Sequence, residues 1–352
     1  MSAVEPRFPF PIPFGWFCVG YPHEFEAGEA KALYYFGKHL VGWRDEAGDL
    51  HVQDAFCPHL GAHLGHGGTV DDGCITCPFH GWKYDAEGAN VEIPYSERIN
   101  KKARLRTFPV AEVNGLSFVW YHPDETVEPM WELPSFPEFN DDPDWAAVTT
   151  TSYEVGTTWQ EMAENGVDSA HFRYVHNTAT VPELDSYETG FPSSAMRSSQ
   201  KFPTPRGVVE GRIDSTSYGP GMSLVSFGGF VDLLNLAATT PIERDRCIIR
   251  FNFRVKSLGD EKTTQGVGMA FAQEVHKQVC EDIPIWEHKA HLVRPALADT
   301  DGPFMKFRKW CTQFYAEGID DGDERLVFEP TWDPARVDES PQKATASARL
   351  GD

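Results

Sequence analysis

Residues 57–80, CPHLGAHLGHGGTVDDGCITCPFH, contain three cysteines and four histidines, and this density of metal-binding side chains constrains the fold more than any other stretch. Cys57-x-His59 and Cys77-x-x-His80 are two similar Cys/His pairs. Glycines follow each pair, and glycine lets a backbone wrap closely around a buried ion or cluster. The stretch therefore predicts a metal centre held between two loops.

Two kinds of centre fit a pair of thiolates and a pair of imidazoles. One is a Rieske-type [2Fe-2S] cluster, which has two thiolates on one iron and two imidazoles on the other. The other is a structural Cys₂His₂ zinc site, and Cys74-x-x-Cys77 also has the spacing of a zinc knuckle or a redox motif. The full pattern CPHLGAHLGHGG…CPFHGWKYD resembles the Rieske signature. That resemblance leaves out His63, His66 and Cys74 and implies four cluster ligands, which are Cys57, His59, Cys77 and His80.

A second metal signal lies in the stretch ENGVDSAHFRYVH. His171 and His176 are five residues apart, which on a regular helix separates them by about 140°, too far to meet at one ion. We therefore expect the helix to end or bulge between them, an irregularity often found at functional sites. Asp168 is expected on the same helix face as His171, where it could hold the imidazole by its other nitrogen.

The pattern Glu-Asn-x-x-Asp-x-x-His-x-x-x-x-His resembles the mononuclear iron site of Rieske non-heme iron oxygenases. Such a site has two histidines and one carboxylate on one face of Fe(II), which leaves positions open for O₂. Spacing alone does not choose the carboxylate among four candidates, which are Glu274, Glu281, Asp282 and Glu287. The stretch CEDIPIWEHK resembles the carboxylate segment of the family, and this implies Asp282 as the third ligand beside His171 and His176.

The same resemblance implies catalytic roles for Asn165 and Asp168. In the family an electron passes between subunits, from a cluster histidine of one chain to an iron-binding histidine of its neighbour, through a carboxylate. Asp168 matches that carboxylate, so it would accept hydrogen bonds from His171 of its own chain and from His80 of an adjacent chain. The simpler alternative is that Asp168 only orients His171.

At 352 residues the chain is long enough for two domains. Residues 10–122 alternate short apolar runs with turn residues, and Asn114-Gly115 is a strong hairpin signal, so this part predicts an antiparallel β domain. Residues 123–143 are rich in proline and acidic residues and predict an extended crossover. A second, catalytic domain is then expected over residues 123–352, which makes the chain an α+β protein.

Within the second domain, residues 157–176 predict a helical segment, residues 177–205 a loop, and residues 207–255 a set of strands. A further helix is expected over residues 269–292, although Pro284 should kink it or end its first half. The run FGGFVDLLNLAATT predicts either a cavity wall or a core strand. The final stretch, DESPQKATASARLGD, lacks core-forming side chains and predicts a mobile tail.

Composition excludes several classes of protein. The net charge of −22 and the absence of a basic stripe argue against nucleic acid as a partner. No apolar run is long enough to span a bilayer, and the start of the chain has no secretory signal pattern, so we expect a soluble cytoplasmic protein with reduced thiols. Cysteines outside the metal stretch are expected in the core, and these are Cys18, Cys247, Cys280 and Cys311.

Three further stretches, IPYSERINKKARLRTFPVAEVNGLSFVWYH, EDIPIWEHK and FRKWCTQFY, resemble the oxygenase components of bacterial 3-ketosteroid 9α-hydroxylases, with sterol 7-desaturases as more distant relatives. The resemblance implies a Rieske domain joined to a helix-grip, START-like catalytic domain, a homotrimer, an NADH-dependent flavin and iron–sulfur reductase, and O₂-dependent hydroxylation of a steroid. Alternatives are a sterol desaturase, a hydroxylase of another hydrophobic ring compound, or an electron-transfer or structural zinc protein.

Overall fold

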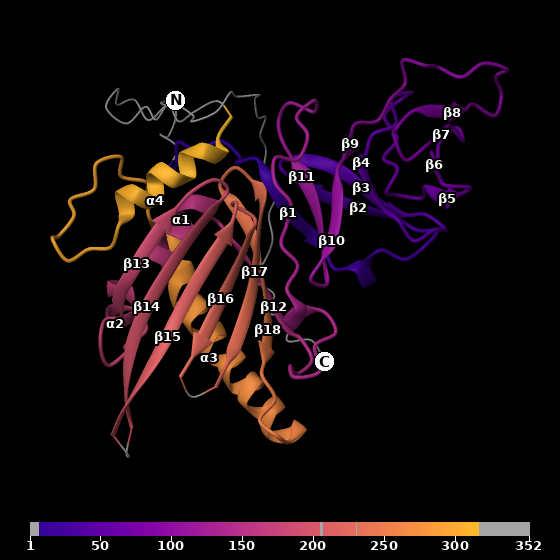
Figure 1. The fold of residues 1–352 in the computed structure, drawn as a ribbon. Coiled ribbons are helices and arrows are strands. Elements are labelled where there is room, and N and C mark those ends of the chain that lie inside the picture. The colour runs from indigo at the N-terminus through magenta and orange to yellow at the C-terminus, as the bar shows by residue number, and fades with distance from the viewer. Residues whose placement is uncertain (1–6, 205–206, 230, 317–352) are drawn as a thin grey trace.

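The computed structural model describes residues 7–204, 207–229 and 231–316. Within them, an N-terminal β part lies beside a larger part in which a long sheet is accompanied by the α-helices (Figure 1). The predicted α+β class is confirmed. The tail predicted to be mobile, residues 338–352, lies outside the described residues.

The N-terminal part contains three small antiparallel sheets in the described residues, with strand orders β1-β11-β10, β2-β3-β4-β9 and β5-β6-β7-β8. The strands are β1 Gly15–Gly20, β2 Ala30–Tyr35, β3 Lys38–Arg44, β4 Leu50–Asp54, β5 Thr69–Asp71, β6 Cys74–Thr76, β7 Lys83–Tyr84, β8 Asn90–Glu92, β9 Thr107–Phe108, β10 Val110–Val113 and β11 Leu116–Tyr121. Asn114 and Gly115 have φ values of 56° and 75° and form the turn between β10 and β11. The predicted hairpin is confirmed, because both turn residues adopt the left-handed backbone that this tight turn requires.

The larger part is built on a seven-stranded antiparallel sheet with the order β12-β18-β17-β16-β15-β14-β13. Its strands are β12 Thr149–Val155, β13 Glu183–Thr189, β14 Ser193–Thr204, β15 Gly207–Tyr218, β16 Met222–Gly228, β17 Leu233–Glu243 and β18 Arg246–Val255. The strands predicted between residues 207 and 255 are confirmed. The loop predicted for residues 177–205 is wrong, because β14 extends the sheet there by pairing with β15, and β13 extends it further by pairing with β14.

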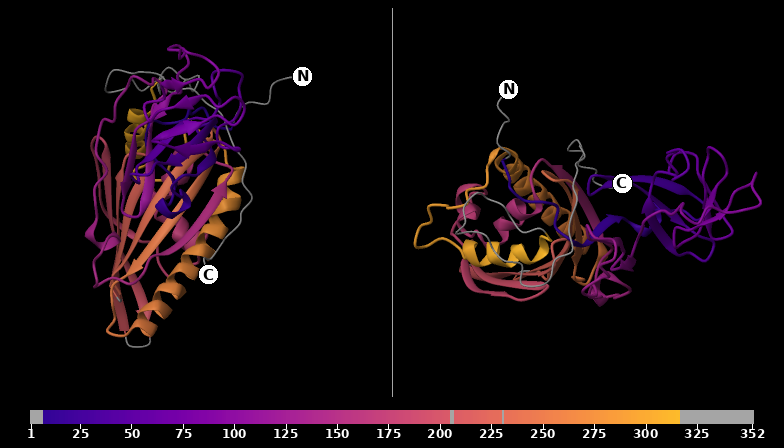
Figure 2. Two further views of the ribbon diagram at one scale, coloured as in Figure 1. Left: turned by 90° about the vertical axis from the view of Figure 1, so that its right-hand side faces the viewer. Right: turned by 90° about the horizontal axis from the view of Figure 1, so that it is seen from above.

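The long helix α3, Glu261–His288, runs along the seven-stranded sheet and contacts β12 and β18 (Figure 2). Its N-terminus is capped by Asp260, whose carboxylate accepts the backbone N–H of Thr263 at 2.8 Å. The helix continues through Pro284, so the prediction that this proline ends its first half is wrong. Burial of Asp282 and Trp286 on either side anchors the last turns against the rest of the molecule. No helix in the described residues is long and apolar enough to cross a membrane.

A chain of short helical segments connects β12 to the site described below. These are α1 Trp159–Ala163, the 3₁₀ helix η3 Glu164–Val167 and α2 Ala170–Tyr174, with α4 Phe304–Cys311 packed against η3. Buried ion pairs hold them: Arg308 contacts Glu164 at 2.5 Å, and Glu161 accepts from His291 at 2.6 Å and lies 2.8 Å from Lys289. Removing one partner of such a pair would leave a buried charge uncompensated. Moving these segments apart is therefore costly.

One large hydrophobic core joins the two parts, because side chains of β1 and β11 pack with those of β17 and of the C-terminal helices. Backbone contacts reinforce it, since the N–H of Phe36 donates to the carbonyl of Pro241 at 3.1 Å. Three of the cysteines predicted in the core, Cys18, Cys247 and Cys311, are buried. Cys280, on α3, is exposed, so that part of the prediction is wrong. The expected domain boundary at residue 122 follows the end of β11 and stays a prediction.

Candidate metal centres

Two loops of the N-terminal part have the same backbone hydrogen bonds. In the first, the N–H of Cys57 donates to Ala62 and its carbonyl accepts from Gly61, both at 2.9 Å. In the second, the N–H of Cys77 donates to Trp82 at 2.8 Å and its carbonyl accepts from Gly81 at 3.0 Å. Gly61 and Gly81 have φ values of 78° and 71°, which explains why glycine occupies both positions.

The loops bring together the four predicted cluster ligands. Cys57 and Cys77 are buried with their thiols within hydrogen-bond reach of each other, and the rings of His59 and His80 lie 4.7 Å apart. The Nδ1 atoms of both histidines are buried without a hydrogen-bond partner among the described residues. Buried polar atoms rarely stay unpaired, so these nitrogens fit iron ligation, and the residues present suit a Rieske cluster.

The other cysteine and histidines of this stretch lie elsewhere. Cys74 is on β6, where it pairs with Asp71 of β5 in a hairpin rather than lying in one of the two cluster loops. Nδ1 of His63 accepts the N–H of Gly65 at 3.1 Å, and its ring lies tilted beside that of His66, with ring centroids 4.5 Å apart. Leaving these three residues out of the ligand set stays a prediction.

Three aromatic residues surround the cluster loops and were not identified as site residues from the sequence. The hydroxyl of Tyr84 lies 3.2 Å from the sulfur of Cys57. Trp82 stacks on His59 at 4.4 Å, and its indole N–H donates to the hydroxyl of Tyr95 at 2.7 Å. Because hydrogen bonds to cluster sulfurs set the reduction potential, Tyr84 is placed to tune it.

The second centre lies where α2 meets α3. His171, His176 and Asp282 each present a ligand atom, and these atoms lie within 4.8 Å of one another. Helix α2 ends at Tyr174, so His176 follows the helix and can face the same point as His171. The predicted helix end between the two histidines is confirmed. Of the four carboxylates left open by spacing on α3, only Asp282 joins this group in the described residues.

Asp168 contacts His171 differently from the prediction. Nδ1 of His171 lies 2.5 Å from the backbone carbonyl of Asp168 and 3.9 Å from its carboxylate. The carboxylate instead accepts the backbone N–H groups of Ala170 at 3.0 Å and His171 at 3.3 Å. Asp168 follows η3 with an extended backbone rather than continuing the helix, which turns its carbonyl toward the ring. The carbonyl therefore orients His171, while Oδ1 of the carboxylate is engaged by backbone N–H groups and Oδ2 lies 3.9 Å from the ring.

Asn165 contacts Asp282, the carboxylate of this centre. The indole N–H of Trp286 donates to its Oδ1 at 3.2 Å, and its side chain also hydrogen-bonds the carboxylate of Asp282. Since Oδ1 accepts from the indole, the amide N–H faces Asp282. Asn165 thus links Trp286 to Asp282, and its predicted catalytic role stays a prediction.

The protonation states also suit a cation at this centre. Burial raises the pKa of Asp282 to about 6, against a lowering by His176. A bound cation would favour the ionised carboxylate. Burial also lowers the pKa of His171, which favours the neutral imidazole that binds metals. The residues present therefore fit a 2-His-1-carboxylate iron site.

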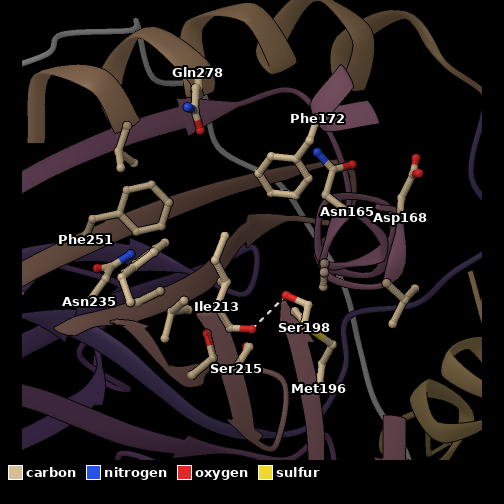
Figure 3. A pocket seen from close by; sticks show the side chains of 18 of the residues that line it. Asn165, Asp168, Phe172, Met196, Ser198, Ile213, Ser215, Asn235, Phe251 and Gln278 are labelled. Atoms are coloured by element: carbon tan, nitrogen blue, oxygen red, sulfur yellow. Dashed lines mark hydrogen bonds between the residues drawn. The ribbon is translucent and has the colours of Figure 1, made fainter. Parts of the chain in front are cut away.

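A cavity of about 600 Å³ opens from the second centre between α3 and the seven-stranded sheet (Figure 3). Its volume suits a drug-sized or larger ligand. The wall is mainly apolar, with Phe251 on the sheet and Phe172 beside Asn165. Both expectations for FGGFVDLLNLAATT are confirmed, because alternate residues of β17 face the cavity and the core. Those facing the cavity are Leu233, Asn235, Ala237 and Thr239.

Comparisons with known proteins agree with this geometry. The Rieske [2Fe-2S] domain family matches residues 15–109, and the 3-Ketosteroid 9alpha-hydroxylase C-terminal domain family matches residues 119–315. An oxygenase component of 3-ketosteroid-9-alpha-monooxygenase from Rhodococcus rhodochrous is 33% identical over 90% of this chain and 88% of its own. Cholesterol 7-desaturase of Caenorhabditis elegans is 31% identical over 87% of this chain and 77% of its own.

Solved structures show the same fold. Dicamba monooxygenase bound to dicamba has a TM-score of 0.71 at 19% identity and covers 85% of this chain and 96% of its own. A variant of NdmA from Pseudomonas putida with caffeine has a TM-score of 0.70 at 20% identity and covers 85% of this chain and 89% of its own. The chain belongs to the Rieske oxygenases, in the family defined by the 3-ketosteroid 9α-hydroxylase catalytic domain. Its cofactors are a Rieske cluster and a mononuclear iron.

Proposed function

We propose that this chain is the terminal oxygenase of a steroid monooxygenase and hydroxylates a 3-ketosteroid, with C9 as the carbon attacked. One oxygen atom of O₂ enters a C–H bond, and the other leaves as water at the expense of two electrons and two protons. The observation that carries the proposal is a largely apolar cavity of about 600 Å³ that ends at His171, His176 and Asp282. Similarity to 3-ketosteroid monooxygenases supports the choice of substrate.

The chain's own residues prepare this chemistry. When bound, the mononuclear iron supplies O₂ activation and the cluster supplies electrons one at a time. Asn165 and the backbone carbonyl of Asp168 fix Asp282 and His171, so the ligands are preorganised. The apolar wall excludes water from the reacting carbon, which protects a reactive intermediate from side reactions.

Asn235 is placed to anchor a substrate carbonyl. It is 4% exposed, lies on β17 among apolar neighbours, and accepts the backbone N–H of Asn252 through Oδ1 at 3.2 Å. Its amide nitrogen therefore has N–H groups to offer to the cavity. In Figure 3 Asn235 lies across the cavity from Asn165 and Asp168. A ketone held there would direct the opposite part of a rigid ring system toward the iron.

The experiment that tests the proposal measures O₂ uptake with a panel of steroids and a competent reductase. We expect 3-ketosteroids to stimulate uptake, and Asn235→Leu to raise their KM by about threefold to tenfold, as loss of one neutral hydrogen bond does. A 3-deoxysteroid should respond little to the same substitution, which serves as the matched control. If no 3-ketosteroid stimulates uptake, the substrate is another hydrophobic ring compound. An alkene product would instead indicate desaturation.

The assembly and partners belong to the same proposal. Within one chain the strands β5 to β8, which lie next to the cluster loops in the sequence, are at one end and α2 is at the other (Figures 1 and 2). An electron therefore reaches the iron more directly from the cluster of an adjacent copy, which supports a homotrimer. An NADH-dependent flavin and iron–sulfur reductase would reduce the cluster. Exposed Leu60, Phe79 and Tyr95 beside the cluster loops offer apolar contacts for such docking. We place the protein in the cytoplasm, where thiols stay reduced.

A further inference from the structure

His176 is held on both sides by neighbouring carboxylates of α3. Its Nε2 lies 3.4 Å from the carboxylate of Asp282, within the group that could bind iron. Its Nδ1 lies 2.9 Å from the carboxylate of Glu281. The side chain of His176 is 2% exposed and that of Glu281 is 30% exposed, so the second contact is partly shielded from water.

The two histidines of the centre differ in the group that each meets at Nδ1. His171 meets a neutral backbone carbonyl, that of Asp168. His176 meets an anionic carboxylate, that of Glu281. A carboxylate at this position holds the proton on Nδ1, leaves the lone pair of Nε2 for the metal and makes the imidazole a stronger donor. A carbonyl provides the orientation with a smaller electrostatic effect.

We propose that Glu281 is a positioning residue that fixes the tautomer of His176 and strengthens the bond between this histidine and the iron. The inference rests on the proposed ligand set but not on the identity of the substrate. Glu281 is not placed as an iron ligand, because its Oε2 meets Nδ1 of His176, on the opposite side of the ring from Nε2, and Glu281 lies outside the group of ligand atoms.

The opposite oxygen of Glu281 is too loosely held to compete with this role. It lies 3.9 Å from the ammonium of Lys277, whose side chain is 57% exposed. An exposed pair at that distance contributes little. The ammonium of Lys277 also lies 3.5 Å from the carboxylate of Glu274, which is three residues earlier on α3. Glu274 therefore shares the lysine contact of Glu281 but lacks its histidine contact, which makes it the matched control.

The test measures the Fe(II) dissociation constant by chelator competition, in protein with an intact cluster and without steroid. We compare Glu281→Gln, Glu281→Ala and Glu274→Gln. Losing the outer partner of a metal-binding histidine weakens metal affinity by about 10- to 100-fold. We expect a loss in that range for Glu281→Ala, a smaller loss for Glu281→Gln, which keeps a neutral acceptor, and no change for Glu274→Gln. The ferrous ligand-field bands should shift in both Glu281 variants.

Two results would overturn the inference. Unchanged affinity and bands in both Glu281 variants would make the residue an ordinary surface carboxylate. Iron binding that survives Asp282→Asn but vanishes in Glu281→Gln would make Glu281 the ligand itself. Because glutamine has nearly the same shape, the Gln variant decides the question even if the Ala variant misfolds. The readout needs no substrate, so it is independent of whether a steroid is the substrate.

Discussion

Asp282→Ala is expected to reduce steroid-dependent turnover to background and to remove about one iron per chain, while the visible bands of the Rieske cluster persist. The variant removes the carboxylate that joins His171 and His176 within 4.8 Å. A site with two imidazoles alone binds Fe(II) poorly. The cluster loops adjoin the small N-terminal sheets, so the substitution should leave the cluster in place. Metal analysis and absorbance on the same sample measure both effects.

Glu274→Ala on the same helix serves as the control for loss of a negative charge, because Glu274 lies outside the group of ligand atoms. It should keep all its iron. Normal iron content and turnover in Asp282→Ala would show that another carboxylate completes the site, and Glu281 would be the first candidate.

Asp168→Asn is expected to keep both metals and to reduce normally at the cluster, yet to pass the electron to the mononuclear iron about 10- to 100-fold more slowly. The carboxylate of Asp168 is 31% exposed and lies 3.9 Å from Nδ1 of His171. Its Oδ1 accepts the backbone N–H of His171 at 3.3 Å. If the carboxylate also accepts from His80 of an adjacent chain, it joins the two centres through that backbone contact and one charge-assisted hydrogen bond. Asparagine removes that charge, and single-turnover stopped flow measures the transfer rate.

Ser169→Ala changes the neighbouring residue without touching a carboxylate and should transfer at the normal rate. An unchanged rate in Asp168→Asn would show that no such bridge exists. Loss of iron in Asp168→Asn would instead assign the carboxylate to the support of His171, through the backbone N–H groups of Ala170 and His171 that it accepts.

Local sequence patterns predicted the features whose cause is local. The two Cys/His loops could be predicted because each ligand pair lies within a single turn and needs its own glycine, as at Gly61 and Gly81. The end of α2 could be predicted because the five-residue spacing of His171 and His176 is incompatible with a regular helix at one ion.

Features decided by distant pairing could not be predicted in the same way. Strands β13 and β14 have polar sequences, and they become strands by pairing, β14 with β15 and β13 with β14. Helix α3 continues past Pro284, where the side chain of Trp286 is buried in the core. The contact between Glu281 and His176 joins residues 105 positions apart. Spacing on α3 alone therefore could not show that Glu281 contacts the histidine while Asp282 joins the metal group.

Single turnover under ¹⁸O₂ tests the central claim most directly. Chemically reduced protein with both metals in place is mixed with a 3-ketosteroid and ¹⁸O₂, and the products are identified by mass spectrometry and NMR. The account requires a monohydroxylated steroid that carries ¹⁸O and is absent in Asp282→Ala. Oxidation of the cluster with the steroid recovered unchanged, across the whole panel of 3-ketosteroids, would contradict it.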